Sequence, residues 1–233
     1  MNSTKRTARV AGVLYLLVGI TGFFNLMYVP GRIFVRGNAT ATASNILAHE
    51  SLFRLGAVSN LIASTVFIFL ALVLYRLLKG VNQHHASLMA ILVFVQVPLA
   101  FLNELNQFAA LALVRGADFL SVFDKPQRDA LAMLFLNLHS QGIIVSQVFW
   151  GLWLLPFGVL VFRSGFLPRV LGLWLMINCF AYLAMSFSGL LLPQYYDMVF
   201  RIAFPALLGE MAIMLWLLIM GAKPQPVQPL AAG

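Results

Sequence analysis

Long apolar runs alternate with short polar segments along almost the whole chain. A bilayer has a hydrocarbon core of about 30 Å, which a helix of roughly 20 apolar residues can cross. Runs of this kind occupy residues 8–29, 56–78, 87–114, a stretch within 131–161, 170–192 and 202–220. Because backbone groups in lipid must find hydrogen-bond partners inside the protein, we predict an all-α membrane protein. It is a bundle of six transmembrane helices with essentially no sheet.

The fourth apolar run is too long for one straight crossing. Asp124 followed by Pro126 is typical of a helix start, since proline is tolerated in the first turn of a helix. Gly142 follows the polar residues 139–141. This pattern predicts a bend at Gly142, between a short interfacial helix and the span itself.

A second short interfacial helix is predicted over residues 44–53, on the outer side and leading into the second span. At its end, Glu50 and Arg54 have the i, i+4 spacing of an ion pair. We expect residues 1–222 to form a single membrane domain. The proline-rich tail, 223–233, is expected to be disordered.

The composition agrees with a membrane protein and excludes two other classes. With 61% hydrophobic and 9% charged residues, the chain is neither a soluble domain, in which about a quarter of residues are charged, nor a disordered protein. The net charge of +8 comes from basic residues spread between the apolar runs. The expected acidic partner is therefore the lipid headgroup, and no nucleic acid partner is expected. Lys5, Arg6 and Arg9 form a basic cluster at the start of the first run, which predicts that both termini are cytoplasmic.

Several short motifs occur in a fixed order from one end of the chain to the other. They are Ala-Gly-Val-Leu-Tyr-Leu-Leu at 11–17, Asn-Ile-Leu-Ala at 45–48, Leu-Phe-Arg-Leu-Gly at 52–56, Leu-Tyr-Arg-Leu-Leu-Lys at 74–79, Arg-Ser-Gly-Phe-Leu-Pro-Arg at 163–169, and Glu210 with Trp216. In these motifs the chain resembles the bacterial membrane-protein family called domain of unknown function 4386, from about residue 6 to residue 223. The resemblance implies a multi-pass protein of the bacterial cytoplasmic membrane. It implies no reaction, cofactor or catalytic residue.

Ionisable side chains inside the apolar runs are the candidate functional residues, because a charge in hydrocarbon costs several kcal/mol by most estimates. Glu104 lies in the third span, Glu210 near the centre of the sixth, and His139 near the outer end of the fourth run. A carboxyl group surrounded by hydrocarbon favours its neutral, proton-carrying form. We therefore predict a polar mid-membrane site for a proton-coupled solute, an ion or a lipid headgroup.

The third span carries further polar side chains. At about 100° per helical residue, Gln96, Asn103 and Gln107 share one face, and Glu104 borders it. We expect this face to point into the bundle. The complete candidate site then consists of Glu104, Glu210, His139, Asn103, Gln107 and Gln96. The alternative stays open that these side chains only hydrogen-bond neighbouring helices and hold the bundle together.

Proline precedes glutamate in the last span of each half of the chain. Pro98 lies about one and a half turns before Glu104, and Pro205 holds the same relation to Glu210. With three spans in each half, a repeat would be inverted, as it is in many transporters. Chance is the alternative, since proline is common in membrane helices.

Two main classes of function fit these residues. A non-catalytic binding or transport-like bundle is favoured, because the polar residues are mostly amides and no nucleophile is paired with a base. The alternative is an intramembrane enzyme for a lipid-like substrate, with Glu104 or Glu210 as acid or base and His139 as partner. A distance within about 4 Å between His139 and a carboxyl group would favour this chemistry. An accessory subunit of a membrane complex is a third class.

No catalytic residue, metal ligand or cofactor is predicted. The histidines and the single cysteine lack the spacing of a zinc or haem site. The expected partners are membrane lipids and a small polar or lipid-like ligand.

Overall fold

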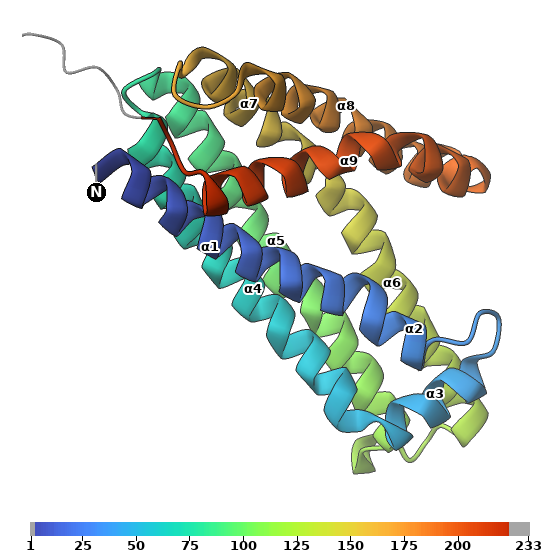
Figure 1. The fold of residues 1–233 in the computed structure, drawn as a ribbon. Helices are drawn as coiled ribbons and strands as arrows, with labels where there is room; N and C mark the ends of the chain where they lie inside the picture. Colours follow the sequence, from blue (N-terminus) through green and yellow to red (C-terminus); the bar gives the residue numbers. More distant parts are fainter. Residues whose placement is uncertain (1–2, 224–233) are drawn as a thin grey trace, which may run out of the picture.

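The computed structural model describes residues 3–223, which fold into a bundle of long helices (Figure 1). The described residues are 88% helical and contain no strand. Six helical segments are long and apolar enough to cross a membrane. The predicted all-α membrane fold is therefore confirmed. Of the predicted tail, only Lys223 lies within the described residues.

Each apolar run of the sequence forms one of the six spans. The spans are α1 (Ser3–Phe23) with η1 (Phe24–Tyr28) and α2 (Val29–Ile33); α4 (Glu50–Leu78); α5 (Gln83–Arg115); α6 (Lys125–Leu152) with α7 (Leu154–Arg163); α8 (Arg169–Leu191); and η3 (Pro193–Tyr195) with α9 (Tyr196–Ile219). Successive spans pack against each other in chain order, and α9 packs against α1. The six spans thus form a closed ring.

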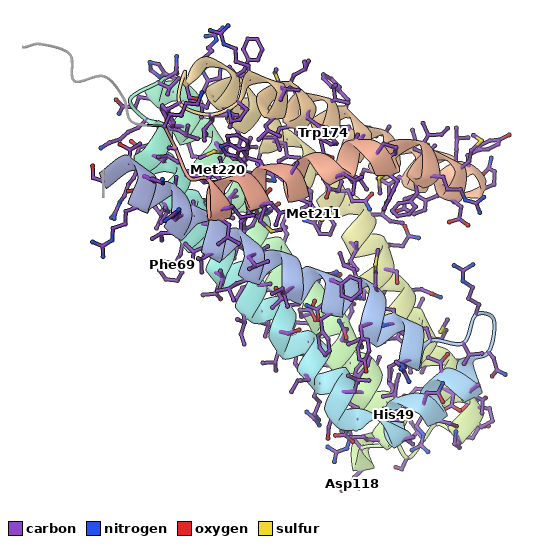
Figure 2. The ribbon with its side chains drawn as sticks, in the orientation of Figure 1. His49, Phe69, Asp118, Trp174, Met211 and Met220 are labelled. Carbon is purple, nitrogen blue, oxygen red and sulfur yellow. The ribbon has the colours of Figure 1, made fainter. Side chains whose placement is uncertain are left out.

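Both described ends of the chain lie at one end of the bundle, called here the terminal end. The Arg9 guanidinium donates to the Ile219 carbonyl oxygen at 3.1 Å there. The short helix α3 (Ala39–Ala48) lies at the opposite end, called the α3 end (Figure 1). Figure 2 shows His49 and Asp118 at the α3 end and Met220 at the terminal end. From the terminal end, α8 and α9 diverge from α4 and α5.

The fourth span begins where the sequence predicts but bends elsewhere. Asp124 caps α6: its side chain accepts from the Gln127 backbone N–H at 2.8 Å, and the Gln127 side chain accepts from the Asp124 N–H. The bend predicted at Gly142 is wrong, because α6 continues through that residue. The helix breaks at Trp153 instead. Pro156 explains this position, since proline has no N–H for the carbonyl of the residue four positions earlier.

The predicted interfacial helix over residues 44–53 is divided in the structure. Its first part belongs to α3, which Asn38 caps by accepting from the Ala41 backbone N–H at 2.9 Å. His49 has non-helical dihedral angles (φ −124°, ψ 37°), so α4 starts at Glu50 and the helix does not run on. The predicted ion pair is confirmed, with Arg54 Nε 2.7 Å from Glu50 Oε1.

The outer surface of the ring is apolar, as contact with lipid requires. Large hydrophobic side chains such as Ile202 and Phe180 are more than 60% exposed on it. Phe69, which projects outward from α4 in Figure 2, is 55% exposed. A continuous exposed apolar surface of this size is not tolerated by soluble monomers.

The interior of the ring contains two separate apolar cores. The larger one lies toward the terminal end and joins α1, α4, α5, α7, α8 and α9 around the buried Trp153 and Phe157. The smaller one lies at the α3 end and includes Ile46 of α3 and Phe53 of α4. The polar side chains inside the bundle lie mainly between these cores.

Close contact between α1 and α9 depends on Gly12. A Cβ atom at this position would collide with the backbone of Leu218. We expect Gly12→Ala to lower the free energy of unfolding by about 2 kcal/mol, because two backbones would have to separate. Gly22→Ala is the matched control in the same helix, since a Cβ there meets nothing within 4 Å. Thermal unfolding in detergent measures both, and equal stability of the two variants would contradict the close packing.

Candidate functional site

The Glu104 carboxyl group is the centre of a polar cluster inside the ring. Glu104 lies on α5 and is 1% exposed. Its Oε1 accepts a hydrogen bond from Asn60 Nδ2 of α4 and lies 3.2 Å from His139 Nε2 of α6. Its Oε2 accepts from Gln107 Nε2, one turn further along α5, at 2.9 Å. These four residues, from three spans, are called the Glu104 cluster.

The hydrogen bonds of the cluster depend on where its proton lies. Gln107 Nε2 lies 3.0 Å from His139 Nε2 as well as near Glu104. An amide nitrogen can only donate, so His139 Nε2 accepts from it when the imidazole is neutral with its proton on Nδ1. The remaining contact, from Glu104 Oε1 to the same nitrogen, is then a hydrogen bond only when Glu104 is protonated. The arrangement is therefore suited to hold one proton on a carboxyl group beside an imidazole.

Asn103 positions α6 against this cluster. Its Nδ2 donates to the backbone carbonyl oxygen of His139 at 3.0 Å. Its side chain also lies against Gly142, where a Cβ atom would collide with it. The glycine that suggested a bend thus serves instead for the close approach of α5 and α6. This contact brings the His139 ring within reach of Glu104.

Two cavities meet at the cluster. The Glu104 cavity, of about 210 Å³, is lined by Gln96, Asn103, Glu104, Gln107 and His139, together with aromatic side chains that include Trp150 and Trp153. The second cavity, of about 450 Å³, is called the vestibule. Residues of η1, α2, α4, α5, α6, α8 and α9 line the vestibule, including Phe34 and Phe53 toward the α3 end. Gln107 and His139 line both cavities, so the cluster lies at their junction.

Three buried polar atoms beside these cavities have no hydrogen-bond partner in the part of the chain that the structure describes. They are Gln96 Oε1 beside the Glu104 cavity, Gln147 Oε1 beside the vestibule, and Asn25 Nδ2 of η1, whose residue lines both. Leaving such a group unpaired costs about 1–3 kcal/mol. Their position beside cavities therefore indicates bound water or a bound polar solute as the missing partner.

The charge of the lining limits what can bind. No Lys or Arg side chain lines either cavity, and the carboxyl group of Glu104 does. An anion buried without a cationic partner is strongly disfavoured. The cavities therefore suit a neutral or cationic ligand and not an anionic one.

Glu210 lies apart from this site. On α9, its Oε1 accepts from the Tyr15 hydroxyl of α1 at 2.5 Å, and its Oε2 accepts from the Tyr182 hydroxyl of α8 at 2.9 Å. It lines neither cavity. The structure thus brings five of the six candidate residues together, Glu104, His139, Asn103, Gln107 and Gln96, and separates Glu210 from them.

Several residues of the site were not expected from the sequence. Asn60 is a lone amide in the second apolar run, Asn25 lies in the last third of the first span, and Gln147 lies near the middle of the fourth. A polar residue inside a predicted span was the available signal for Asn60. Nothing in the sequence indicated which of these side chains face Glu104, because that depends on helix packing.

The arrangement provides no evident metal site. The described residues contain no group of three or more His, Cys, Asp or Glu side chains placed to hold a metal ion. Glu104 and His139 are the one acidic and the one imidazole group that line the two cavities. The chemistry available there is proton binding and hydrogen bonding.

The comparison with known families matches nearly the whole chain. The family model described as domain of unknown function (DUF4386) covers residues 10–221. The chain belongs to this family. No curated protein and no solved structure matches the chain. The DUF4386 protein is thus a multi-pass, membrane-type helical bundle of a family without an assigned function.

The contact between Glu104 and His139 predicts an energetic coupling. In a double-mutant cycle, Glu104→Gln and His139→Gln should show a coupling of about 1–2 kcal/mol in the free energy of unfolding, because their side chains share hydrogen bonds. Glu104→Gln and Glu210→Gln should be additive within about 0.5 kcal/mol, since the two glutamates belong to separate clusters. Unfolding of the purified variants in detergent measures both cycles. Additivity in the first cycle would argue against the Glu104 cluster.

Proposed function

We propose that the DUF4386 protein is a binding or transport-like protein that takes a small neutral or cationic polar solute beside Glu104, in a proton-linked manner. The observation that carries this proposal is the buried Glu104–His139 pair at the junction of two cavities without basic lining. Unpaired amide atoms of Gln96 and Gln147 beside the cavities supply hydrogen-bond acceptors for such a solute.

The proton linkage follows from charge balance in a low-dielectric site. A cation beside Glu104 needs the ionised carboxylate as its partner, because an unpaired charge there is strongly disfavoured. A proton on the same carboxyl group removes that partner. Cation and proton therefore compete for Glu104, while Trp150 and Trp153 offer aromatic faces to the cation.

The proposal includes an orientation in the membrane. Lys5, Arg6 and Arg9 lie at the terminal end, which we place on the cytoplasmic side of a bacterial cytoplasmic membrane. The vestibule then reaches toward the outer side. With this orientation the site would be approached from outside, and the larger apolar core would separate it from the cytoplasm.

Choline serves as a test cation because it is small and carries a permanent charge. At a concentration 100-fold above its dissociation constant, choline should stabilise the protein by about 2.7 kcal/mol, seen as a rise in the unfolding temperature. The stabilisation should depend on the Glu104 carboxylate, which is the partner that the cation needs. Acetate of equal concentration should give none.

Two variants make this test specific. Glu104→Gln should lose the choline effect, whereas Glu210→Gln should keep it. Equal stabilisation of the wild-type protein and Glu104→Gln by choline would overturn the assignment of the site. Stabilisation by acetate would overturn the inference from the charge of the lining.

The distance between His139 and Glu104 favours a second candidate function, that of an intramembrane enzyme. His139 Nε2 lies 3.2 Å from Glu104 Oε1, within range for proton transfer in acid–base catalysis on a lipid-like substrate. Against it, no serine or cysteine nucleophile is hydrogen-bonded to the pair among the described residues, and Ser146 Oγ donates to the Gly142 carbonyl oxygen instead. Vesicles of phosphatidylethanolamine, a lipid without net charge, distinguish the two functions. Release of fatty acid or headgroup by the wild-type protein, lost in His139→Gln, would establish the enzyme.

A further inference from the structure

A buried amide side chain without a hydrogen bond of normal geometry lies beside Glu210 and its two tyrosine partners. Asn178, one turn before Tyr182 on α8, is fully buried and faces the Glu210 carboxyl group. Neither its Oδ1 nor its Nδ2 forms a hydrogen bond within the described chain. An unpaired buried amide is costly, which points to a partner that binds here or forms in another conformation.

The hydrogen-bond partners of each glutamate come from two corresponding spans: the second span of its own half and the first span of the other half. Glu104, on the third span of the first half, contacts Asn60 on the second span of its own half and His139 on the first span of the other half. Glu210, on the third span of the second half, contacts Tyr182 on the second span of its own half and Tyr15 on the first span of the other. A twofold axis that exchanges the halves would produce this arrangement.

The two glutamates also lie toward opposite ends of the bundle. Glu104 lies 11 residues before Arg115, where α5 ends at the α3 end. Glu210 lies 9 residues before Ile219, where α9 ends at the terminal end. An axis relating them would therefore run in the plane of the membrane, which is the geometry of an inverted repeat.

The breaks and prolines within the spans also occur at corresponding places in the two halves. The first span of each half departs from regular α-helix in its second part, just before a proline. In the first half this is the π-helix η1 before Pro30, and in the second half it is the break at Trp153 before Pro156. The third span of each half contains an internal proline, Pro98 or Pro205, before its glutamate. Proline removes a backbone hydrogen bond at each of these points, where a helix can bend with least loss.

Asn178 corresponds to Asn60 when the two halves of the chain are compared. It lies 9 residues after Arg169, where α8 starts, and Asn60 lies 10 residues after Glu50, where α4 starts. Asn60 donates to Glu104 in the described state, whereas Asn178 lies against Glu210 without a hydrogen bond of normal geometry. The two halves therefore differ, with one amide hydrogen-bonded to its glutamate and the other only in contact with it.

We propose that Glu210, with Asn178, Tyr15 and Tyr182, is a second proton and solute site, related to the Glu104 site by an inverted repeat. It opens toward the terminal end when the vestibule closes. In that state Asn178 donates to Glu210 as Asn60 now donates to Glu104, and the tyrosines release the carboxyl group. This inference rests on the proposed function, since it supplies the opposite face of the same transport cycle.

Cys179 is a native reporter of this opening. It is the single cysteine of the chain, it is 1% exposed, and it belongs to the apolar core that contains Tyr15, a partner of Glu210. Its alkylation by N-ethylmaleimide, followed by intact mass, measures how often that core opens. Ser140→Cys in a Cys179→Ser background reports on the vestibule, which residue 140 lines.

The test removes the two hydrogen bonds that hold Glu210. In the Tyr15→Phe and Tyr182→Phe double variant, alkylation of Cys179 should rise about tenfold, because the described state loses both hydrogen bonds to Glu210. Alkylation of the vestibule reporter should fall at the same time, by up to about half, as that state becomes less populated. Tyr75→Phe, which removes a hydroxyl that does not contact Glu210, should change neither rate.

The alkylation rates of Cys179 and of the vestibule reporter distinguish a change between two conformations from a general loss of stability. A rise of both rates in the double variant would overturn the proposal, because the bundle would then only be less stable. An unchanged rate at Cys179 would overturn it as well. Neither result bears on the loss of choline binding in Glu104→Gln, so the proposed function at Glu104 fails or holds independently.

Discussion

A carboxyl group inside a membrane must find its hydrogen-bond partners within the protein, and the interior of this bundle is arranged around that requirement. Glu104 obtains partners from α4, α5 and α6, and Glu210 obtains them from α1 and α8. Each cluster therefore joins three spans. The alternative, an unpaired carboxyl group in hydrocarbon, costs several kcal/mol.

The same requirement is met differently at the two glutamates. Glu104 lies where two cavities meet, beside amide atoms that lack partners among the described residues. Glu210 is half-buried and is held by two tyrosine hydroxyls, of which that of Tyr15 comes from the larger apolar core. The first carboxyl group therefore adjoins open space, and the second has its partners in the helices packed around it.

Local sequence signals predicted local structure well and long-range structure poorly. Asp124 and Pro126 marked the start of α6 because capping involves residues within one turn. Gly142 was misjudged as a bend, since its role is to admit Asn103 of another helix. Pro156, which does break the helix, lay inside an apolar run that gave no reason to divide it there.

The sequence by itself determined the membrane, the six spans and the two intramembrane glutamates, because each follows from hydropathy and from the cost of charge in lipid. It also placed Gln96, Asn103 and Gln107 on one face of the third span, since helical periodicity is a local property. Only the tertiary structure decided that His139 meets Glu104 while Glu210 bonds Tyr15 and Tyr182. Those contacts join residues far apart in the chain, and the packing of apolar helix surfaces, which carries no local sequence code, sets which of them meet.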